Sequence, residues 1–554
     1  MKGLVAILAI ILLTASFFGK DSSDLERMTI LFSNDIHGGI APQKAEFLNP
    51  DFPPMLGGGA SAAAIIKKVR DDAEKDGTLE LLLDGGDLFQ GTLVGTRSSG
   101  MAVIEYMNLV GYDATVVGNH EFDLGKDNLI ELIKASDFHW LSCNIYDTET
   151  GDHWEWVKPA VIHEEKGLKI GLTGVTTVAT QFMSFPDHVA GLEFRNEIVE
   201  LQKQVDYLQA QNVDIVIALA HVGLAYNPRK GYEELKERTK QDAIDKGHVT
   251  SMELAHYVRG IDILVNGHIH KGYERPWEDP VNHTICLQNY GNGSNLGWID
   301  FEIDQPTKTI AGYSSPADNG TLLLLLQDQF WPDSTVLAFL TEQQEKYEAG
   351  FREVVGEIKK GLNRSSVSEA TMNNFITDVI SKRVKADFSF MNFGGIRADL
   401  RAGPVTREDI FKVLPFGNEI VVFQCDGRFL KRIIETKLAG GGRGLAVSGV
   451  KVVYNRSLPD GQKVVQLTVG GEPIDPDKTY RVATNNYLME GNSGLRLLTD
   501  IPEAQINNVG FKIGDAVVEY FEENKVVEPK LDGRWKRDDS AQPSQEWLKT
   551  FETT

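Results

Sequence analysis

The sequence predicts an α/β protein with its strands and helices in layers, and three observations lead to this prediction. Between residues 28 and about 305, apolar strand-forming runs alternate with stretches of helical periodicity, which is the βαβ pattern of a layered α/β domain. Five of these runs end in short polar motifs, and open α/β sheets place ligands at the carboxyl ends of their strands. A second mixed α/β unit begins after Phe351.

Length, composition and charge limit the functions that fit this chain. Its 554 residues are enough for two or three domains. The net charge of −23 argues against a nucleic acid polymer as partner, because such a partner needs a basic face. Small anionic substrates are not excluded, because bound metal ions dominate the field in a site.

The first 20 residues resemble a signal peptide. Lys2 precedes an apolar stretch over residues 4–18, which is short for a membrane span. An uncleaved membrane anchor is the alternative. No second long apolar run follows. We therefore expect export to the periplasm or the extracellular space, with no stable membrane span after removal of the signal.

The first domain is expected at residues 28–325. Its predicted strands include the five motif-bearing runs, which are 28–32, 79–83, 114–117, 213–220 and 261–265. Its predicted helices include 61–75, 101–109, 127–136 and 196–211.

A linker and a second domain follow. The linker, residues 326–350, contains an amphipathic helix at 334–348, with Pro332 and Asp333 as start signals. The second domain, residues 351–538, is a mixed α/β unit for which we expect helices at 368–384 and 429–437 and strands at 387–391, 450–454, 464–469 and 480–483. Residues 539–554 form a polar tail with little expected structure.

The polar motifs after the five strands supply a set of metal ligands. A pair of divalent metal ions suits the hydrolysis of a phosphoester, because the ions bind phosphoryl oxygens, lower the pKa of a bridging water and stabilise the in-line transition state. Such a site needs imidazole, carboxylate and amide ligands. The candidates are Asp35, His37, Asp87, Asn119, His221, His268 and His270. Asp87 follows a central strand and is the natural bridging carboxylate. These ligand types suit Zn, Mn, Fe or Co.

In this order the motifs resemble those of the calcineurin-like metallophosphatases. The sequence Gly-Asn-His-Glu-Phe-Asp at residues 118–123 resembles the 5′-nucleotidase branch in particular. The resemblance implies two metal sites that share Asp87, one completed by Asp35, His37 and His270 and the other by Asn119, His221 and His268. It also implies that His120 is the catalytic histidine and that Asp123 orients its ring.

The second domain resembles the C-terminal substrate domain of 5′-nucleotidases, which include bacterial periplasmic UDP-sugar hydrolases and animal ecto-nucleotidases. The resemblance rests on Asn-Phe-Gly-Gly-Ile-Arg at residues 392–397 and on Leu-Pro-Phe-Gly-Asn at residues 414–418. It implies that Arg397 and Arg364 bind phosphate oxygens and that Phe416 and Tyr487 stack on the base, since every base has a π-face. The substrate-binding candidates are Arg364, Asn392, Gly395, Arg397, Phe416, Asn418 and Tyr487.

Two positions depart from the family pattern. Ser493 stands where the family has an Asp that binds ribose hydroxyls, and Ser368 stands where it has a further phosphate-binding Arg. A charged two-point acceptor is replaced by one hydroxyl at Ser493, which weakens the expected recognition of ribose.

The predicted function is that of an exported dimetal phosphohydrolase of the 5′-nucleotidase type, in which a metal-bridging water attacks phosphorus with the help of His120 and Asp123. The resemblance further implies that the second domain rotates on the linking helix. The alternatives are a nucleotide-sugar or diphosphate hydrolase, a cyclic-nucleotide phosphodiesterase, or a non-nucleotide phosphoesterase. A non-catalytic binding protein of the same fold would lack ligands, and none is missing from this sequence.

Overall fold

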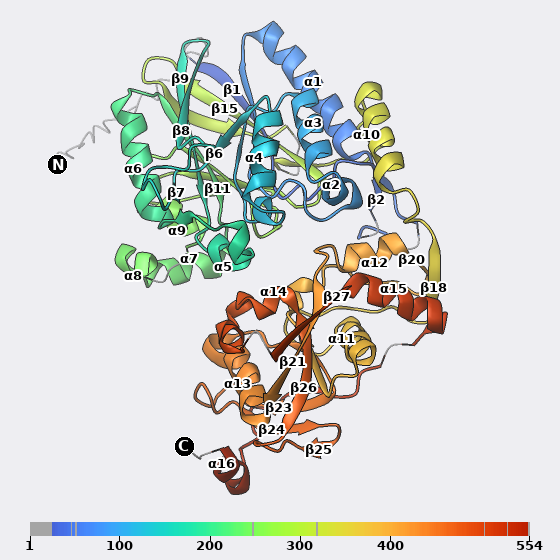
Figure 1. Cartoon of the computed structure of the whole chain (residues 1–554). Helices are drawn as coiled ribbons and strands as arrows, with labels where there is room; N and C mark the ends of the chain where they lie inside the picture. Colours follow the sequence, from blue (N-terminus) through green and yellow to red (C-terminus); the bar gives the residue numbers. More distant parts are fainter. Residues whose placement is uncertain are drawn as a thin grey trace, which may run out of the picture.

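The structure is a computed structural model that describes residues 25–45, 47–49, 52–245, 249–316, 320–502, 505–528 and 530–551. The signal peptide expected at residues 1–20 lies outside the described residues. The chain forms two lobes, which are connected through α10 (Ser334–Tyr347) and β18 (Val354–Ile358) (Figure 1). Within the described part of the chain, no helix has the length and apolar character needed to span a membrane.

The first lobe is built on two mixed sheets. One has the order β16-β15-β1-β4-β5-β6, with β17 also pairing β15. Its strands are β1 (Leu25–Ser33), β4 (Leu79–Asp84), β5 (Ala114–Val116), β6 (His139–Leu141), β15 (Asn295–Asp304), β16 (Thr309–Ser314) and β17 (Leu322–Leu324). The other has the order β13-β14-β12-β11-β9-β8. Its strands are β8 (Ala160–Glu165), β9 (Leu168–Thr176), β11 (Ile215–His221), β12 (Ile263–Asn266), β13 (Trp277–Glu278) and β14 (Ile285–Gln288).

Each sheet contains a run of four parallel strands, which antiparallel strands extend: β15, β16 and β17 in the first sheet, and β8 and β13 in the second. Strands β1, β4, β5 and β6 run parallel, as do β9, β11, β12 and β14. The two sheets share one hydrophobic cluster, to which Ile30 and Phe32 contribute from β1 and Ile217 from β11. This sharing means that the sheets pack face to face, so that their carboxyl-terminal ends can meet at one edge.

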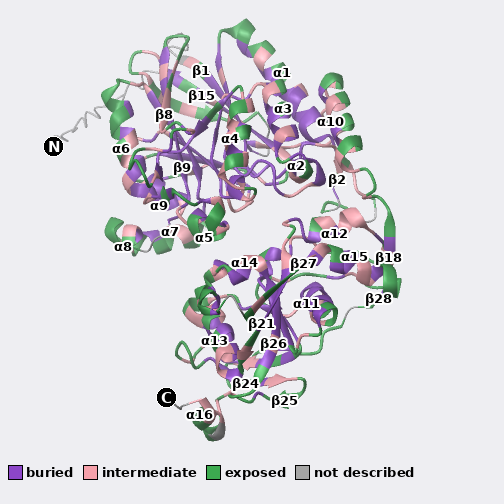
Figure 2. Ribbon diagram, in the orientation of Figure 1, coloured by how far each residue is buried: buried purple, intermediate pink, exposed green. Residues whose placement is uncertain are grey.

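Helices cover the outer face of each sheet, as the sequence pattern predicts. Leu31, on the opposite face of β1 from Ile30, packs in a second cluster with the helices α1 (Gly58–Asp76), α3 (Met101–Val110) and α4 (Lys126–Ala135). On the other side α6 (Glu197–Ala210) and α9 (Ser251–Tyr257) pack on the second sheet. The strands in the middle of this lobe are accordingly buried (Figure 2).

Shorter elements complete the first lobe. They are β2 (Gln43–Lys44), β3 (Met55–Leu56), α2 (Leu93–Arg97), β7 (Ile145–Asp147), α5 (Thr180–Met183), β10 (Leu192–Phe194), α7 (Pro228–Lys236) and α8 (Lys240–Asp245).

The second lobe has a central five-stranded sheet with the order β22-β19-β26-β21-β27. Its strands are β19 (Phe388–Met391), β21 (Glu419–Asp426), β22 (Ala446–Ser448), β26 (Thr479–Asn485) and β27 (Ile506–Lys512). One hydrophobic cluster joins this sheet to α11 (Thr371–Val384) and α15 (Ile513–Asn524), and another joins it to α13 (Gly427–Leu438).

Two small sheets flank the centre of this lobe. They contain β18, β20 (Gly403–Thr406) and β28 (Val526–Val527) on one side, and β23 (Val450–Tyr454), β24 (Val464–Val469), β25 (Glu472–Pro473) and β29 (Trp535–Arg537) on the other. The short helices are α12 (Arg407–Val413) and α14 (Asn486–Met489).

Two segments differ from the sequence expectation. The helix predicted from residue 368 begins at Thr371, because Ser365 accepts from the backbone of Ser368 and forms a turn there instead. The tail expected to have little structure contains α16 (Gln545–Phe551). Trp547 Nε1 donates to the carbonyl of Val464 at 3.1 Å, so an aromatic residue anchors this helix to the second lobe.

Candidate metal centre and substrate cavity

The carboxyl ends of five strands, three from one sheet and two from the other, bring the predicted metal ligands together. Their side chains form two groups whose ligand atoms lie within 4.8 Å of one another, Asp35 with His37 and His270, and Asp87 with His221 and His268. Asn119, from the loop after β5, joins the second group through its side-chain oxygen, which lies 2.9 Å from Nδ1 of His268. All seven predicted ligands therefore lie at one edge of the lobe.

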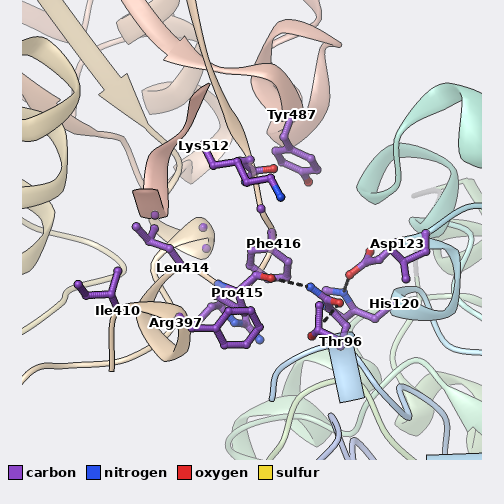
Figure 3. Close-up of a pocket in the computed structure, with 18 of the residues that line it drawn as sticks. Thr96, His120, Asp123, Arg397, Ile410, Leu414, Pro415, Phe416, Tyr487 and Lys512 are labelled. Carbon is purple, nitrogen blue, oxygen red and sulfur yellow. Dashed lines mark hydrogen bonds and ion pairs between the residues drawn. The ribbon is translucent and has the colours of Figure 1, made fainter. Parts of the chain in front are cut away.

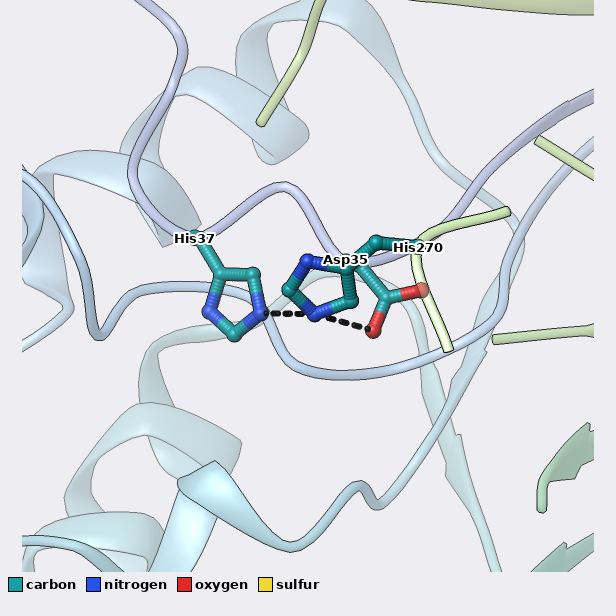
Figure 4. A group of neighbouring side chains, drawn as sticks. All are labelled: Asp35, His37 and His270. Atoms are coloured by element: carbon teal, nitrogen blue, oxygen red, sulfur yellow. Dashed lines mark hydrogen bonds and ion pairs between the residues drawn. The ribbon is translucent and has the colours of Figure 1, made fainter. Parts of the chain in front are cut away.

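In the first group, the ring nitrogens and the carboxylate oxygen that could bind a metal ion face one another. Nε2 of His37 lies 2.9 Å from Nε2 of His270, which in turn lies 3.5 Å from Oδ1 of Asp35 (Figure 4). Nδ1 of His37 contacts the carbonyl oxygen of Gln90 at 2.6 Å. With its proton on Nδ1, the His37 ring presents Nε2 to the group as an acceptor, which is the form that binds metal ions.

The second group is linked to the first by Asp87. Oδ2 of Asp87 lies 3.0 Å from Nε2 of His221 and 3.9 Å from Nε2 of His37. Nδ1 of His221 contacts the carbonyl oxygen of Gly85 at 2.7 Å, so its Nε2 also faces the group. Asp87 thus lies within reach of a histidine from each group.

The backbone holds these side chains in an uncommon conformation. Five ligand candidates have left-handed φ values, namely Asp35 (49°), His37 (49°), Asp87 (62°), His268 (81°) and His270 (53°). Each such residue costs about 1–3 kcal/mol and persists only where surrounding contacts fix it. Glu121 supplies some of these contacts, since its carboxylate accepts from the backbone N–H groups of Asp87, Leu88 and Gly118 at 3.0, 2.7 and 2.7 Å.

Burial and charge in the two groups fit divalent metal ions. Burial raises the pKa of Asp35 to about 7, and it lowers the pKa values of His268 and His270 to about 3 and about 4. Both histidines are therefore neutral, which is the ligating form. Nε2 of His221 is buried and lacks a hydrogen-bond partner among the described residues, although Asp87 lies close. When several buried acceptor atoms point toward the same place, a bound cation there is favourable, because it compensates for the cost of burying them.

His120 and Asp123 lie beside the metal groups at the wall of a cavity. Nδ1 of His120 contacts Oδ2 of Asp123 at 2.7 Å (Figure 3). The backbone N–H of His120 donates to Oδ1 of Asp87 at 2.8 Å. Burial disfavours the charged His120 ring, but Asp123 and Asp87 outweigh it and raise its pKa to about 9. A protonated His120 next to the metal groups is suited to an anionic substrate.

The cavity has a volume of about 690 Å³ and lies between the two lobes. The first lobe contributes Gln90, Asn119, His120, Asp123, Ser184 and Phe185 among others. The second lobe contributes six of the seven predicted substrate-binding residues, which are Asn392, Gly395, Arg397, Phe416, Asn418 and Tyr487.

The two predicted stacking residues contact aromatic rings of the first lobe. The ring of Phe416 stacks on that of His120, with centroids 5.8 Å apart and planes inclined by 13°. Tyr487 meets Phe185 edge to face at 5.9 Å. The guanidinium carbon of Arg397 lies 5.6 Å from the Phe416 ring centroid. Two of these contacts span the lobes, so the substrate residues of the second lobe lie next to the metal centre.

Arg364 is the predicted substrate residue that does not line the cavity. Its side chain is exposed, and its guanidinium donates to the carbonyl of Ile396 at 3.3 Å. It is near enough that, after burial, its charge is the next cause of the lowered pKa of Arg397. A buried guanidinium with a second one nearby favours an anion beside it, because the anion offsets both the burial and the repulsion of like charges.

The two departures from the family pattern lie in different places. Ser493 lines the cavity in a left-handed conformation with φ of 54°, and Lys437 Nζ donates to its carbonyl at 2.5 Å. Ser368 does not line the cavity, and its hydroxyl contacts that of Ser365 at 2.8 Å.

Sequence reasoning missed several residues of the cavity, among them Gln90, Phe185 and Lys512. Gln90 stands three residues after Asp87, so its place in the same loop is a weak signal. Phe185 and Lys512 come from segments without a motif, and nothing in the sequence pattern indicates that they lie at the cavity.

Two family models match the chain. Residues 28–272 match calcineurin-like phosphoesterase, and residues 354–500 match the C-terminal domain of 5′-nucleotidase. The first range contains all seven metal-ligand candidates, and the second contains all seven substrate-binding candidates.

Relatives and solved structures resemble the chain over nearly its whole length. A 5′-nucleotidase of Mus musculus is 29% identical over 560 residues, which cover 92% of this chain and 90% of that one. A 5′-nucleotidase of Vibrio cholerae is 28% identical over 537 residues, covering 91% of each chain. The crystal structure of a 5′-nucleotidase precursor from Thermus thermophilus has a TM-score of 0.78 at 26% identity and covers 93% of this chain and 100% of its own. A sulfate thiohydrolase of the same organism shares the fold, with a TM-score of 0.73 at 20% identity, covering 93% of this chain and 98% of its own.

Proposed function

We infer from its membership of the 5′-nucleotidase family that this chain is a metal-dependent phosphoric ester hydrolase, and we propose that it cleaves the phosphomonoester of nucleotides. The family follows from the matches to both domain models and from relatives that cover nine-tenths of the chain. The observation that supports the proposed chemistry most directly is the convergence of seven ligand candidates at one edge of the first lobe, with His120 beside them and Arg397 of the second lobe lining the same cavity.

We propose two divalent metal ions that share Asp87. Asp35, His37 and His270 would hold one ion, and Asn119, His221 and His268 would hold the other. When bound, such ions polarise phosphoryl oxygens and lower the pKa of water. Zn, Mn, Fe and Co are all consistent with nitrogen and oxygen ligands.

His120 is proposed as the catalytic histidine. Asp123 holds the proton of Nδ1, and this contact leaves Nε2 as the atom that can face a substrate. Because its pKa is raised to about 9, the ring is protonated at neutral pH. Its role is to stabilise charge on the transferring phosphoryl group or to pass the Nε2 proton to the leaving oxygen.

Arg397 is proposed to bind the phosphate that is cleaved. It lines the cavity beside Phe416, and its guanidinium can donate two parallel hydrogen bonds to phosphate oxygens. Arg364 lies outside the cavity lining but near enough to add positive charge there.

A nucleoside monophosphate is the proposed substrate class. Phe416 and Tyr487 offer aromatic faces in the same cavity, and Asn392 and Asn418 offer polar groups for the base. Ser493 provides only a hydroxyl on the ribose side, so we expect weaker discrimination of the sugar than a carboxylate gives.

We further propose that the protein is exported and that the second lobe moves on the linker around α10 during the reaction. The pattern of Lys2 and the apolar stretch supports export. The position of the cavity between two lobes that one linker connects supports the motion.

The experiment that tests the proposed function is a hydrolysis assay that separates and quantifies the products formed from AMP, ADP, UDP-glucose and 2′,3′-cyclic AMP, each with added Mn, Zn, Co or Mg. We expect the highest kcat/KM with AMP. A dominant rate on a substrate without a terminal phosphomonoester would contradict the monoesterase proposal, and no hydrolysis of any substrate with any metal would contradict the enzyme proposal.

A further inference from the structure

Gln90 contacts both lobes of the molecule. It belongs to the loop after β4 in the first lobe, and it is only 5% exposed. Its side-chain Nε2 donates to the carbonyl of Pro415, in the second lobe, at 3.0 Å. Among the described residues this is the one hydrogen bond that joins the two lobes across the cavity. The other contacts there, such as that of Phe185 with Tyr487, are ring contacts without a directional donor.

The amide of Gln90 is held in the orientation that this bond needs. Thr96, in α2, donates its hydroxyl to Oε1 of Gln90 at 3.3 Å. Because the amide oxygen is engaged by Thr96, the NH₂ group faces Pro415. A proline carbonyl in a loop has no strand partner of its own, and an amide donor satisfies it.

The backbone of Gln90 contacts the metal centre. Its carbonyl oxygen lies 2.6 Å from Nδ1 of His37 and orients that ring. The next residue, Gly91, packs so closely that a Cβ atom there would lie 2.9 Å from the carbonyl oxygen of His37 and 3.0 Å from its Cβ. The segment therefore has little freedom to move relative to His37.

The loop that Gln90 holds carries the ring that covers His120. Pro415 directly precedes Phe416, whose ring stacks on His120 at 5.8 Å (Figure 3). The backbone N–H of Arg397 donates to the carbonyl of Val413 at 2.8 Å, so the position of this loop also sets that of the phosphate-binding candidate. A contact at Pro415 thus fixes two substrate residues relative to the metal groups.

We propose that Gln90 is a positioning residue that couples the closed arrangement of the two lobes to the metal centre. It holds residues 413–416 of the second lobe in register with His120, while its backbone holds His37. The inference rests on the proposed function, because the effect concerns the placement of a substrate that the second lobe carries. Gln90 lines the cavity, and the role proposed for it is to position Phe416, Arg397 and His37 rather than to act on the reacting atoms.

The decisive comparison uses Gln90→Leu, which keeps the size of the side chain and removes the donor, and Gln90→Glu, which keeps the acceptor for Thr96 but turns a carboxylate toward the Pro415 carbonyl. Gln202→Leu is the matched control, since Gln202 Nε2 makes the same kind of bond, at 3.1 Å, to the carbonyl of Arg259 within the first lobe. For each variant, kcat and KM for AMP, the metal content and the radius of gyration in solution without substrate are measured.

We expect Gln90→Leu to lower kcat about 3- to 10-fold, the effect of losing one buried hydrogen bond, with KM within about 2-fold. Gln90→Glu should lower kcat at least as much. Both should raise the radius of gyration while the metal content stays that of the parent protein, and Gln202→Leu should change none of these values. Thr96→Val should act in the same direction, and Thr96→Ser should restore the parent kcat.

Two outcomes would overturn the inference. One is a Gln90→Leu variant with unchanged kcat and radius of gyration. The other is a loss of activity that follows a loss of bound metal, which would make Gln90 a support of His37 alone. A double variant with Phe416→Ala adds a further check, because coupled residues give less than additive losses. If the parent protein hydrolyses no substrate, the proposed function fails, and the radius of gyration still decides whether Gln90 holds the lobes together.

Discussion

The two sides of the cavity are built differently. On the first lobe, the ligand candidates Asp35 and Asp87 are 0% and 1% exposed, adopt left-handed φ values and accept hydrogen bonds from the backbone. On the second lobe, Arg397, Phe416 and Asn418 are only partly buried, and Tyr487 has a ring contact with the opposite lobe. Groups that hold metal ions and stabilise charge in the transition state must be fixed in place beforehand, so they need rigid and buried surroundings. Side chains that contact the rest of a substrate do not need the same rigidity.

The two departures expected from the resemblance fall on one side of this comparison. All ligand candidates and the pair of His120 and Asp123 are retained, and both departures, at Ser368 and Ser493, are on the second lobe. Changes on the first lobe are therefore expected to affect turnover, and changes on the second lobe to affect substrate affinity.

The largest expected effect is that of metal removal, which tests the first-lobe side of the cavity as a whole. Dialysis against a chelator should reduce phosphate release to background, and addition of one metal at a time should restore it. Binding of metal to the folded chain should also raise the free energy of unfolding, by about 2.7–4.1 kcal/mol for a metal at 100 to 1,000 times its Kd. Activity that survives exhaustive chelation would contradict this view of the first lobe.

The next effect is that of His120→Ala, which should lower kcat about 10²- to 10⁴-fold with little change in KM, because the group acts on the transition state. Asp123→Asn should cost less, about 10- to 100-fold, since it acts through the ring of His120. Steady-state kinetics with AMP checks both. A large rise in KM with unchanged kcat would assign His120 to substrate binding instead.

Phe416→Ala tests the second-lobe side of the cavity. Stacking on a base is worth about 1–3 kcal/mol, so KM for AMP should rise roughly 5- to 150-fold. Tyr487→Ala should act in the same direction. The substitution Phe185→Leu serves as a control, because it removes the ring of the first lobe that contacts Tyr487. Equal effects of all three substitutions would indicate that the rings serve lobe packing rather than stacking on a base.

Ser493→Asp should have a smaller effect, and in the favourable direction. Asp tolerates the left-handed conformation found at this position, and its carboxylate can accept from two ribose hydroxyls. KM for AMP should fall roughly 3- to 10-fold, whereas KM for a 2′,3′-dideoxynucleotide should not. A parallel change for both substrates would show that residue 493 does not read the sugar.

The smallest effect concerns stability rather than activity, and it contrasts a buried carboxylate of each lobe. Glu197 is 0% exposed and its Oε2 lacks a hydrogen-bond partner among the described residues, whereas Glu435 accepts from the backbone N–H groups of Lys463 and Val464. Burial raises the pKa of Glu197 to about 7 from its ordinary value of 4.5, so the folded chain binds more protons than the unfolded chain between these values. The free energy of unfolding should therefore fall as pH rises through this window.

Glu197→Gln removes this cost. Above pH 7 the variant should gain about 1–3 kcal/mol in the free energy of unfolding, and it should gain nothing near pH 4. Glu435→Gln, which loses an ion pair with Lys431, should not gain stability at any pH. Denaturant unfolding of both variants at several pH values gives the comparison, and a gain at Glu197 that does not depend on pH would refute the cause given.

Much of the local structure can be predicted from the sequence. The apolar runs at 28–32 and 79–83 lie within β1 and β4, and the helices expected at 61–75 and 334–348 lie within or near α1 and α10. These predictions succeed because burial imposes a period on the residues of each element. Asp87 and His120 could be singled out for the same reason, since they follow such runs directly.

The tertiary structure alone decided which strand ends meet and which loops face one another. That β11 and β12 belong to a second sheet, packed on the first, determines that His221 and His268 reach Asp87, and no periodicity encodes the pairing of two sheets. The same holds for the contact of Gln90 with Pro415, which are 325 residues apart in loops without a repeating pattern. A sequence specifies the face that each element buries, but the distance between side chains on different elements is set only when those faces pack together.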